Sequence, residues 1–279
     1  MTDVTTAPAV ALNDGAAIPQ LGFGVFQVPP EETQEAVETA LDAGYRHVDT
    51  AAAYGNEAGV GAAIAAAGLD RDEVFVTTKL WNSEHGYEPA LAAFDASLER
   101  LGLDRVDLYL IHWPVPAEDR YLETWRAFEQ IQSEGRARSI GVSNFRVEDL
   151  ERLKEEGGKL PSVNQVELHP RLQQAELRAW HEDHGVVTEA WSPLAQGALL
   201  DDDTIVTVAA HHEKTPAQTI LRWHLQLGNV VIPKSVTPAR VRENIDVFDF
   251  ELSEDDMAAI ARLDAGARTG PDPAEFVAP

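Results

Sequence analysis

The sequence predicts an α/β fold, a (β/α)8 TIM barrel with an N-terminal β-hairpin and an extra C-terminal helix. Eight short apolar runs of strand length alternate with helical patterns along the 279 residues, and eight such units close a TIM barrel. The runs are nearly continuous in apolar residues, as expected for parallel strands that helices cover on the outside. Because no linker-like break separates the units, a single domain over residues 1–279 is expected.

The first predicted element is a hairpin over residues 10–18. Asp14 and Gly15 lie between short apolar stretches, and an Asp-Gly dipeptide in this position is typical of a tight hairpin turn. We expect the hairpin to cover the closed bottom of the barrel.

The eight strands follow, each predicted where a run rich in β-branched and aromatic residues is bounded by turn residues. They cover residues 21–24, 45–49, 74–79, 106–111, 139–143, 162–167, 186–190 and 230–233.

Helices are predicted between the strands, where apolar residues recur at three- and four-residue steps and Gly often ends the pattern. The first helix begins near Pro29 and Pro30 and ends at Gly44, and a later one runs from about Leu122 to Gly135. The others cover residues 56–67, 88–101, 147–156, 174–184, 216–227, 238–247 and 253–263. The tail, residues 264–279, is rich in Gly, Ala and Pro and is expected to lie over the surface as irregular chain.

Composition excludes several classes of function. A formal net charge of −25 argues against a surface for nucleic acid or anionic membrane, because both require excess Lys and Arg. The absence of Cys excludes disulfides, Cys-ligated zinc and a thiol nucleophile. Residues 1–8 show no secretory signal, and no apolar run is long enough to cross a bilayer. A soluble cytoplasmic protein without a metal site is therefore expected, since His181 and His184 have the wrong spacing for a helical zinc pair.

Polar side chains follow several of the predicted strands. Asp49, Lys79 and His112 each stand at the end of a strand, and Tyr54 lies shortly after the first of them. In a closed parallel barrel the carboxyl ends of all strands meet on one face. A phenol donates protons poorly at neutral pH unless a cation favours its phenolate, and Lys79 could supply that charge while Asp49 orients it. With His112 directed at a carbonyl oxygen, the four residues would form a proton-donating pocket for a reducible C=O group.

Three long stretches resemble the aldo-keto reductase family, namely residues 44–57, 106–114 and 232–240. The lysine in residues 77–81 also stands where the family has its own. The resemblance runs from about residue 10 to residue 263, and the bacterial branch with 2,5-diketo-D-gluconate reductases is the most similar. It implies that Tyr54 is the general acid and that Lys79 lowers its pKa. It further implies that Asp49 pairs with Lys79 and that His112 positions the carbonyl.

The same resemblance implies NADPH as cofactor. The residues that match its contacts are Ser143, Asn144 and Gln165 for the carboxamide, Trp191 for stacking on the nicotinamide, Ser192, Leu194 and Gln196 for the pyrophosphate, and Lys234, Ser235, Val236, Arg240 and Asn244 for the 2′-phosphate and adenine. Two cations beside a Ser in an acidic protein suit a phosphate, so NADPH is preferred over NADH. The alternative is that Lys234 and Arg240 only form surface ion pairs.

Four aromatic residues are expected to line a substrate pocket, namely Phe23, Phe26, Trp81 and Trp113. The stretch after Gly197 is short and the tail is brief, which suggests an accessible pocket. The expected substrates are small aldehydes, dicarbonyls or keto sugar acids, such as methylglyoxal or 2,5-diketo-D-gluconate, reduced by a monomer.

Two other functions remain open at this point. A barrel glycosidase would use paired carboxylates, for which Glu167 and Glu189 are the candidates. A catalytically silent NADPH-binding regulatory protein of the same fold is the second. Consumption of NADPH with a small dicarbonyl would separate the reductase from both.

Overall fold

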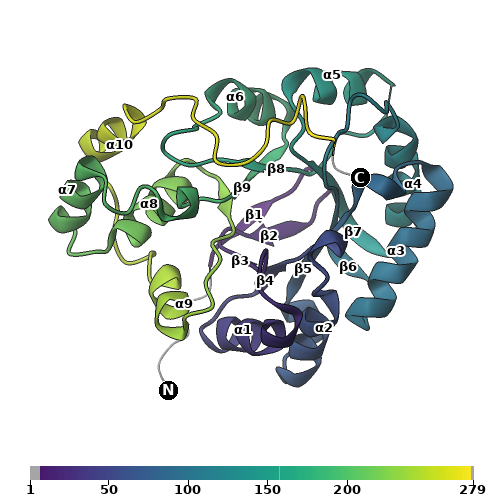
Figure 1. Ribbon diagram of the computed structural model, residues 1–279, viewed down its shortest axis with the longest axis horizontal. Coiled ribbons are helices and arrows are strands. Elements are labelled where there is room, and N and C mark those ends of the chain that lie inside the picture. The colour runs from purple at the N-terminus through teal and green to yellow at the C-terminus, as the bar shows by residue number, and fades with distance from the viewer. Residues whose placement is uncertain (1–6, 157, 278–279) are drawn as a thin grey trace.

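A computed structural model describes residues 7–156 and 158–277, and its centre is a curled sheet of eight parallel strands (Figure 1). In chain order the strands are β3 (Phe23–Gly24), β4 (His47–Asp49), β5 (Phe75–Leu80), β6 (Val106–Ile111), β7 (Ala137–Ser143), β8 (Val163–Glu167), β9 (Val187–Trp191) and β10 (Val230–Val231). Each strand pairs in parallel with the next one along the chain. All eight predicted strands are present within a few residues of their expected bounds.

Hydrogen bonds also connect the two edges of the sheet. Leu21 forms a parallel bridge with Val231. The backbone N–H of Gly22 donates to the Val231 carbonyl at 2.9 Å, and that of Gly24 donates to the Pro233 carbonyl at 3.1 Å. The end of the sheet at β10 is therefore hydrogen-bonded to residues in and just before β3, and the sheet curls back on itself.

Ten helices surround the outside of the sheet in the described part of the chain (Figure 1). They are α1 (Pro30–Asp42), α2 (Glu57–Ala66), α3 (Tyr87–Leu101), α4 (Tyr121–Ser133), α5 (Val147–Glu156), α6 (Ala175–His184), α7 (Asp203–His211), α8 (Pro216–Gln226), α9 (Pro238–Ile245) and α10 (Glu254–Ala261). Short 3-10 turns η1 (Ala52–Tyr54) and η4 (Ala195–Gly197) lie at the ends of strands β4 and β9. Helix α10 is the extra C-terminal helix that the sequence predicts.

Helix α7 is the element that the sequence analysis did not predict. The Asp202 side chain caps it by accepting a hydrogen bond from the Thr204 N–H at 3.0 Å. The helix buries Ile205, Val208 and Ala209 on one face. Its β-branched residues have low helix propensity, so the local sequence gives little indication of a helix. Packing against α8 and α10 stabilises the helix instead.

The N-terminal hairpin covers one end of the sheet, as predicted. Strands β1 (Ala9–Ala11) and β2 (Ala17–Pro19) pair antiparallel. Leu12 and Ile18 are buried in a small apolar cluster. The other buried members of this cluster come mainly from the amino-terminal parts of strands, and they are Phe75, Leu108, Leu110, Val163 and Val230. The hairpin therefore lies at the end opposite to the strand carboxyl termini.

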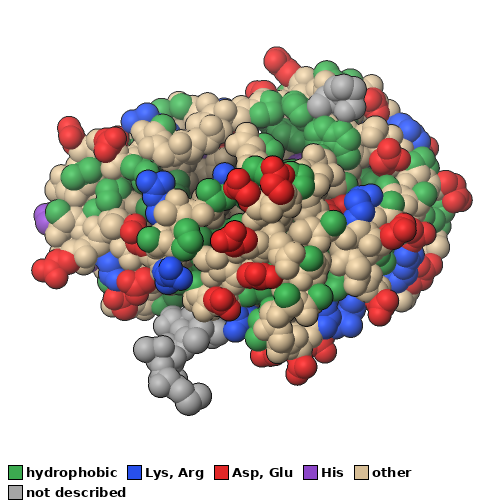
Figure 2. Space-filling model, turned by 60° about the horizontal axis from the view of Figure 1, so that its bottom comes forward, with side chains coloured by type: hydrophobic (Ala, Val, Ile, Leu, Met, Phe, Trp, Pro, Cys, Tyr) green, Lys and Arg blue, Asp and Glu red, His purple; other side chains and the backbone are tan. Residues whose placement is uncertain are grey.

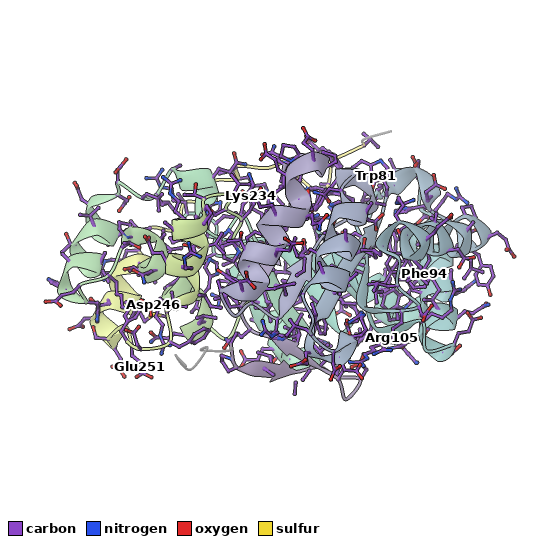
Figure 3. All side chains as sticks on the ribbon, turned by 90° about the horizontal axis from the view of Figure 1, so that it is seen from below. Trp81, Phe94, Arg105, Lys234, Asp246 and Glu251 are labelled. Carbon is purple, nitrogen blue, oxygen red and sulfur yellow. The ribbon has the colours of Figure 1, made fainter. Side chains whose placement is uncertain are left out.

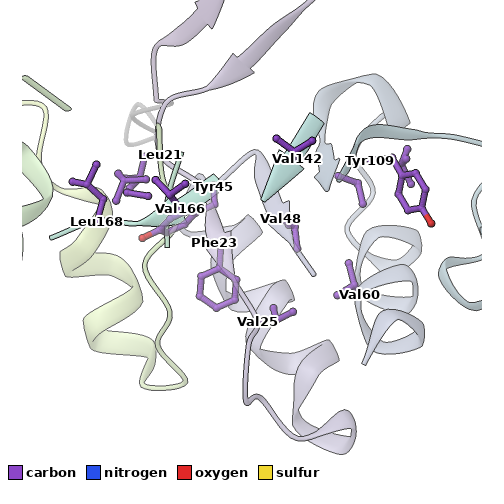
Figure 4. Packing of buried hydrophobic residues seen from close by; sticks show 14 of the residues in the cluster. Leu21, Phe23, Val25, Tyr45, Val48, Val60, Tyr109, Val142, Val166 and Leu168 are labelled. Atoms are coloured by element: carbon purple, nitrogen blue, oxygen red, sulfur yellow. The ribbon is translucent and has the colours of Figure 1, made fainter. Parts of the chain in front are cut away.

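The larger core fills the layer between the sheet and the helices. Its bulkiest buried side chains include Trp125, Phe128 and Tyr109, which stack between β6 and α4. Phe23 and Tyr45 pack edge-to-face with ring centroids 5.7 Å apart in the same cluster (Figure 4). The Tyr45 hydroxyl donates to the Val241 carbonyl of α9 at 3.2 Å, which satisfies the one polar group of this buried ring.

The C-terminal tail is irregular, as expected, but it is anchored across the strand ends. The backbone N–H groups of Ala265 and Ala267 donate to the Arg171 carbonyl at 3.1 and 3.0 Å. Thr269 and Gly270 then donate to the buried Glu167 carboxylate. Figure 1 shows this yellow segment running over β8 towards α5.

The surface is strongly acidic, and Figure 2 shows Asp and Glu side chains spread over the face that it presents. Among the described residues, no helix combines the length and the apolar character that crossing a membrane requires.

Gly61 in α2 provides a test of the helix layer. A Cβ atom added there would lie 1.9 Å from the Leu101 carbonyl oxygen at the end of α3. At an open helix position, Gly→Ala stabilises by about 1 kcal/mol. We expect Gly61→Ala to lower the free energy of unfolding instead, by about 1–3 kcal/mol, because backbone atoms must move.

Urea denaturation measures this change, with Ala65→Gly on the exposed face of α2 as the control for helix propensity. A Gly61→Ala variant more stable than the natural protein would contradict the close approach of α2 and α3.

Candidate active site

The polar residues at the strand ends gather at one end of the sheet. Asp49 is the last residue of β4, Lys79 lies in β5, and His112 directly follows β6. Tyr54 is the last residue of η1, the turn that follows β4. Parallel strands that curl into one sheet bring all these ends to a common mouth. Figure 3 shows Trp81 and Lys234 at that end and Arg105 and Glu251 at the opposite end.

Lys79 is the centre of the site. Its ammonium group is fully buried and donates to Asp49 Oδ1 at 2.7 Å and to the Thr50 carbonyl at 2.9 Å. It also lies 3.4 Å from the Tyr54 hydroxyl oxygen. The Tyr54 and His112 rings meet edge-to-face with centroids 5.7 Å apart. The structure therefore brings together all four residues that the sequence analysis assigned to proton donation.

Burial and nearby charge act in opposite directions on the pKa values of Tyr54 and Lys79, and in the same direction on that of His112. Burial raises the pKa of the Tyr54 phenol, and the Lys79 ammonium opposes this without reversing it. Burial alone would lower the pKa of Lys79, but the acidic groups around it, among which Asp49 has the largest effect, together outweigh burial, so the net pKa is raised. Burial, with a smaller effect of Lys79, moves the pKa of His112 well below its ordinary value. At neutral pH the site therefore holds a phenol, an ammonium and an uncharged imidazole. Lys79 acts on Tyr54 in the expected direction, but its effect is smaller than that of burial.

A chain of hydrogen bonds links this group to the predicted cofactor residues on β7 and β8. The Gln165 amide donates to Asp49 Oδ2 at 2.8 Å. The Ser143 hydroxyl donates to the Gln165 carbonyl at 2.8 Å. Asn144 Nδ2 donates to the Ser143 hydroxyl at 3.1 Å and to the His112 carbonyl at 3.0 Å. Ser143, Asn144 and Gln165 thus form one cluster beside Asp49.

Trp191 presents a flat aromatic surface whose position is fixed from two sides. Its indole N–H donates to Asn144 Oδ1 at 2.9 Å. On the other side the tail approaches so closely that a Cβ atom on Gly270 would lie 2.4 Å from Trp191 Cη2. Only glycine allows this approach without a shift. Trp191 remains half-buried at the mouth.

The loop after β9 holds the three residues predicted to contact the pyrophosphate. Ser192 and Gln196 have positive φ angles of 48° and 55°, and Leu194 between them is half-buried. Non-glycine residues with positive φ are costly and tend to persist where function needs the conformation. Asn144, with φ of 63°, is a further example at this mouth.

The predicted adenosine-phosphate residues follow β10 and continue into α9. Lys234, Val236 and Arg240 are exposed, whereas Asn244 is buried, one turn after Arg240. The Ser235 hydroxyl accepts a hydrogen bond from the Thr237 N–H at 3.1 Å. Neither Lys234 nor Arg240 forms an ion pair with any residue in the described part of the chain. The alternative that these two cations only form surface ion pairs therefore has no support among the described residues.

Three of the four predicted aromatic residues surround the mouth. The Phe26 ring lies 5.0 Å from the Tyr54 ring and is 54% exposed. The Trp81 ring lies 5.1 Å from His112, and Trp113 stacks near His112 at 6.4 Å. The prediction for Phe23 was wrong, because that ring is 1% exposed and packs on Tyr45 in the core (Figure 4). Side chains alternate along a strand, so Phe23 points to the helix layer.

Phe276 is a further aromatic residue at the mouth that was not predicted from the sequence. Its ring lies 4.2 Å from the Trp113 ring and 6.4 Å from the Trp81 ring. The tail therefore adds a wall to the aromatic pocket, and the accessibility of that pocket stays a prediction. A single aromatic residue in a Pro- and Ala-rich tail was the available signal, but no pattern in the sequence tells where an irregular tail packs.

The two carboxylates of the glycosidase alternative each have structural partners. Glu167 accepts from the Thr269 hydroxyl at 2.6 Å and from His169 at 3.1 Å. Glu189 is fully buried and accepts from the Gln165 amide at 2.8 Å. Among residues 7–156 and 158–277, no group of three or more His, Asp or Glu side chains is arranged to hold a metal ion.

Comparisons with known proteins agree with this geometry. The profile of the aldo/keto reductase family matches residues 20–265. An aldo-keto reductase of Mycobacterium sp. strain KMS is 61% identical, with 97% of this chain and 98% of the relative covered. Methylglyoxal reductase DkgA of Escherichia coli K12 is 52% identical, with 96% and 97% covered. A crystal structure of a Gox0644 variant in complex with NADPH is 48% identical with a TM-score of 0.94, and 98% of this chain and 100% of that chain are covered.

Glu189 gives a prediction for the dependence of stability on pH. Burial first, and then the charge of Asp49, raise its pKa from 4.5 to about 8. A carboxyl with a raised pKa binds its proton more tightly in the folded protein, so its contribution to stability is full below about pH 4.5 and is lost as the pH rises to about 8. We expect Glu189→Gln to remove this decline, which makes the variant more stable than the natural protein at about pH 8 by on the order of 3 kcal/mol.

Urea denaturation at about pH 5 and about pH 8 measures the difference, and Glu167→Gln is the matched control. Hydrogen bonds outweigh burial at Glu167 and lower its pKa, so its contribution has the opposite sign and is lost as the pH falls. Parallel pH curves for the natural protein and Glu189→Gln would contradict the raised pKa.

Proposed function

We propose that this chain, which belongs to the aldo/keto reductase family, reduces the carbonyl group of small aldehydes, dicarbonyls or keto sugar acids with Tyr54 as general acid. The chain is an NADP-dependent oxidoreductase and uses NADPH. The observation that carries the proposal is the fully buried Lys79 ammonium, held 2.7 Å from Asp49 and 3.4 Å from the Tyr54 hydroxyl. Membership of this family of oxidoreductases argues against both alternatives, the barrel glycosidase and the catalytically silent NADPH-binding protein.

The proposed proton transfer starts from the phenol that the site keeps protonated. Tyr54 gives its proton to the carbonyl oxygen of the substrate, and the Lys79 ammonium stabilises the phenolate that remains. Asp49 holds Lys79 charged and in place. His112 is uncharged, so one ring nitrogen can donate a hydrogen bond to the same carbonyl oxygen without adding a full charge. When bound, NADPH supplies the hydride.

The described residues fit this cofactor. Ser143, Asn144 and Gln165 would bind the nicotinamide carboxamide, and Trp191 would stack on the ring. No residue of the described chain donates to Gln165 Oε1, whereas both donated bonds of its amide nitrogen are made. The remaining proposed contacts are Ser192, Leu194 and Gln196 for the pyrophosphate and Lys234, Ser235, Val236, Arg240 and Asn244 for the 2′-phosphate and adenine.

The proposed substrate pocket consists of Phe26, Trp81, Trp113 and Phe276. These rings lie beside Tyr54 and His112, which suits a small molecule whose carbonyl reaches both groups. Methylglyoxal and 2,5-diketo-D-gluconate are the proposed test substrates, since a relative that is 52% identical is named methylglyoxal reductase.

For the architecture, we propose a closed (β/α)8 TIM barrel in one domain over residues 1–279. The bridge between Leu21 and Val231 supports closure, and the continuous sheet supports a single domain. Residues 1–6, 157, 278 and 279 lie outside the described part. A cytoplasmic monomer completes the proposal, and sedimentation equilibrium tests the oligomeric state.

Replacing the phenol tests the assigned acid. Tyr54→Phe removes the hydroxyl and keeps the ring, so we expect kcat with methylglyoxal to fall by roughly 10²–10⁴-fold. NADPH affinity should stay nearly unchanged, because the hydroxyl bonds to Lys79 on the proton-donating side of the site. Steady-state turnover and a fluorescence titration measure the two quantities. Full turnover in this variant would refute Tyr54 as the acid.

Removing the exposed cations tests the preference for NADPH. Lys234→Ala or Arg240→Ala should weaken NADPH binding by roughly tenfold or more, because each loses a charge-assisted hydrogen bond to the 2′-phosphate. NADH lacks this phosphate and should lose much less affinity. Titrations with both cofactors provide the comparison, and Arg242→Ala in the same helix is the control. Equal losses for NADPH and NADH would remove the 2′-phosphate assignment.

A further inference from the structure

The Gln165 amide lies between two buried carboxylates. Its Nε2 atom is 2.8 Å from Asp49 Oδ2 and 2.8 Å from Glu189 Oε2. Gln165, Asp49 and Glu189 are all almost completely buried. They come from neighbouring or facing strands, since β8 pairs with β9 and Gln165 is the direct partner of Glu189 in that pair.

This arrangement fixes which atom of the amide faces which side. An amide nitrogen has two hydrogens, and here one is donated to each carboxylate. Flipping the amide would place Oε1 against Asp49 Oδ2, an oxygen of the Lys79 counter-ion, and leave that buried acceptor without its donor, which is costly. Glu189 Oε2 accepts the second amide hydrogen, and without this side chain that hydrogen would lose its buried partner. Gln165 therefore keeps Oε1, an acceptor, on the side away from both acids.

The protonation of Glu189 is compatible with this role. Four ionisable groups face it. Three belong to the proton-donating group, namely Asp49, Lys79 and Tyr54, and the fourth is His47 of β4. Burial first, and then Asp49, raise the pKa of Glu189 to about 8, while burial lowers the pKa of His47 to about 3. Both are uncharged at neutral pH. Glu189 Oε1 lies 3.6 Å from His47 Nε2, so a proton on Oε1 leaves Oε2 free to accept from Gln165.

An uncharged Glu189 also leaves the ion pair undisturbed. Asp49 remains the counter-ion of Lys79 at 2.7 Å. A permanently charged second carboxylate would compete for Lys79 and carry a further desolvation cost. Glu189 can thus hold the amide without changing the charge balance of the proton-donating group at neutral pH.

We propose that Glu189 is a positioning residue which, together with Asp49, holds the Gln165 amide so that Oε1 accepts a hydrogen bond from the N–H group of the nicotinamide carboxamide. Glu189 acts through Gln165 and does not touch the cofactor. The inference rests on the proposed cofactor site. Glu189 would thus contribute to the preference for a cofactor with a carboxamide group, in addition to its effect on stability.

The test compares NADPH with its 3-acetylpyridine analogue, which has a methyl ketone in place of the carboxamide and therefore lacks the N–H donor. Binding of each is measured by quenching of tryptophan fluorescence. We expect the natural protein to prefer NADPH by roughly three- to tenfold, the value of one hydrogen bond. Glu189→Met, which has similar volume and no acceptor, should lose most of this preference. Glu189→Gln keeps an acceptor oxygen and should retain it.

Glu57→Met is the matched control. Glu57 is another buried carboxylate, but it bonds to Thr78 and Arg100 and not to Gln165. It should retain the preference for NADPH even if stability falls. A loss of preference in this variant as large as in Glu189→Met would overturn the assignment to Glu189.

Two further results would overturn the proposal. One is equal affinity of the natural protein for both cofactors, a measurement that does not depend on the folding of any variant. The other is an undiminished preference in folded Glu189→Met. Turnover of methylglyoxal is measured separately on the natural protein. Normal cofactor preference without turnover would refute the proposed reaction and leave the role of Glu189 supported.

Discussion

The buried ion pair between Lys79 and Asp49 is the interaction on which the site depends. An ammonium group with no exposure to water costs several kcal/mol unless nearby groups compensate for the lost hydration. Here the Asp49 carboxylate, the Thr50 carbonyl and the Tyr54 hydroxyl surround it. Because these partners come from β4 and the turn after it, the ion pair fixes two neighbouring strand ends and the proposed acid in one arrangement. Asp49 also keeps Lys79 charged although burial favours the neutral amine.

Hydrogen bonds extend this constraint from the proton-donating group to the proposed cofactor contacts. Gln165 connects Asp49 to Ser143, and Asn144 connects Ser143 to the His112 backbone and to Trp191. A disturbance at Asp49 would therefore reach side chains on β7 and β9 through buried polar contacts. Such networks are stable only when nearly every member is satisfied, and this links the geometry of the two halves of the site.

The C-terminal tail completes the mouth from a distant part of the sequence. Glu167 at the end of β8 binds Thr269 and Gly270, Gly270 lies against Trp191, and Phe276 packs on Trp113. One buried carboxylate thus anchors the segment that covers the indole and adds a wall to the aromatic pocket. The shape of the proposed substrate pocket depends on how this irregular tail is held.

The sequence by itself determined the alternation of eight strands and their helices, the hairpin at one end and the gathering of Asp49, Tyr54, Lys79 and His112. Local apolar periodicity and turn residues carry that information, and parallel strands place their ends together whatever the details of packing. Tertiary structure alone decided that Phe23 is a core residue, that residues 203–211 form a helix, and that Phe276 reaches Trp113. It also decided the net pKa of Tyr54 and the contacts of Glu189, because burial and hydrogen bonds depend on neighbours that are distant in sequence.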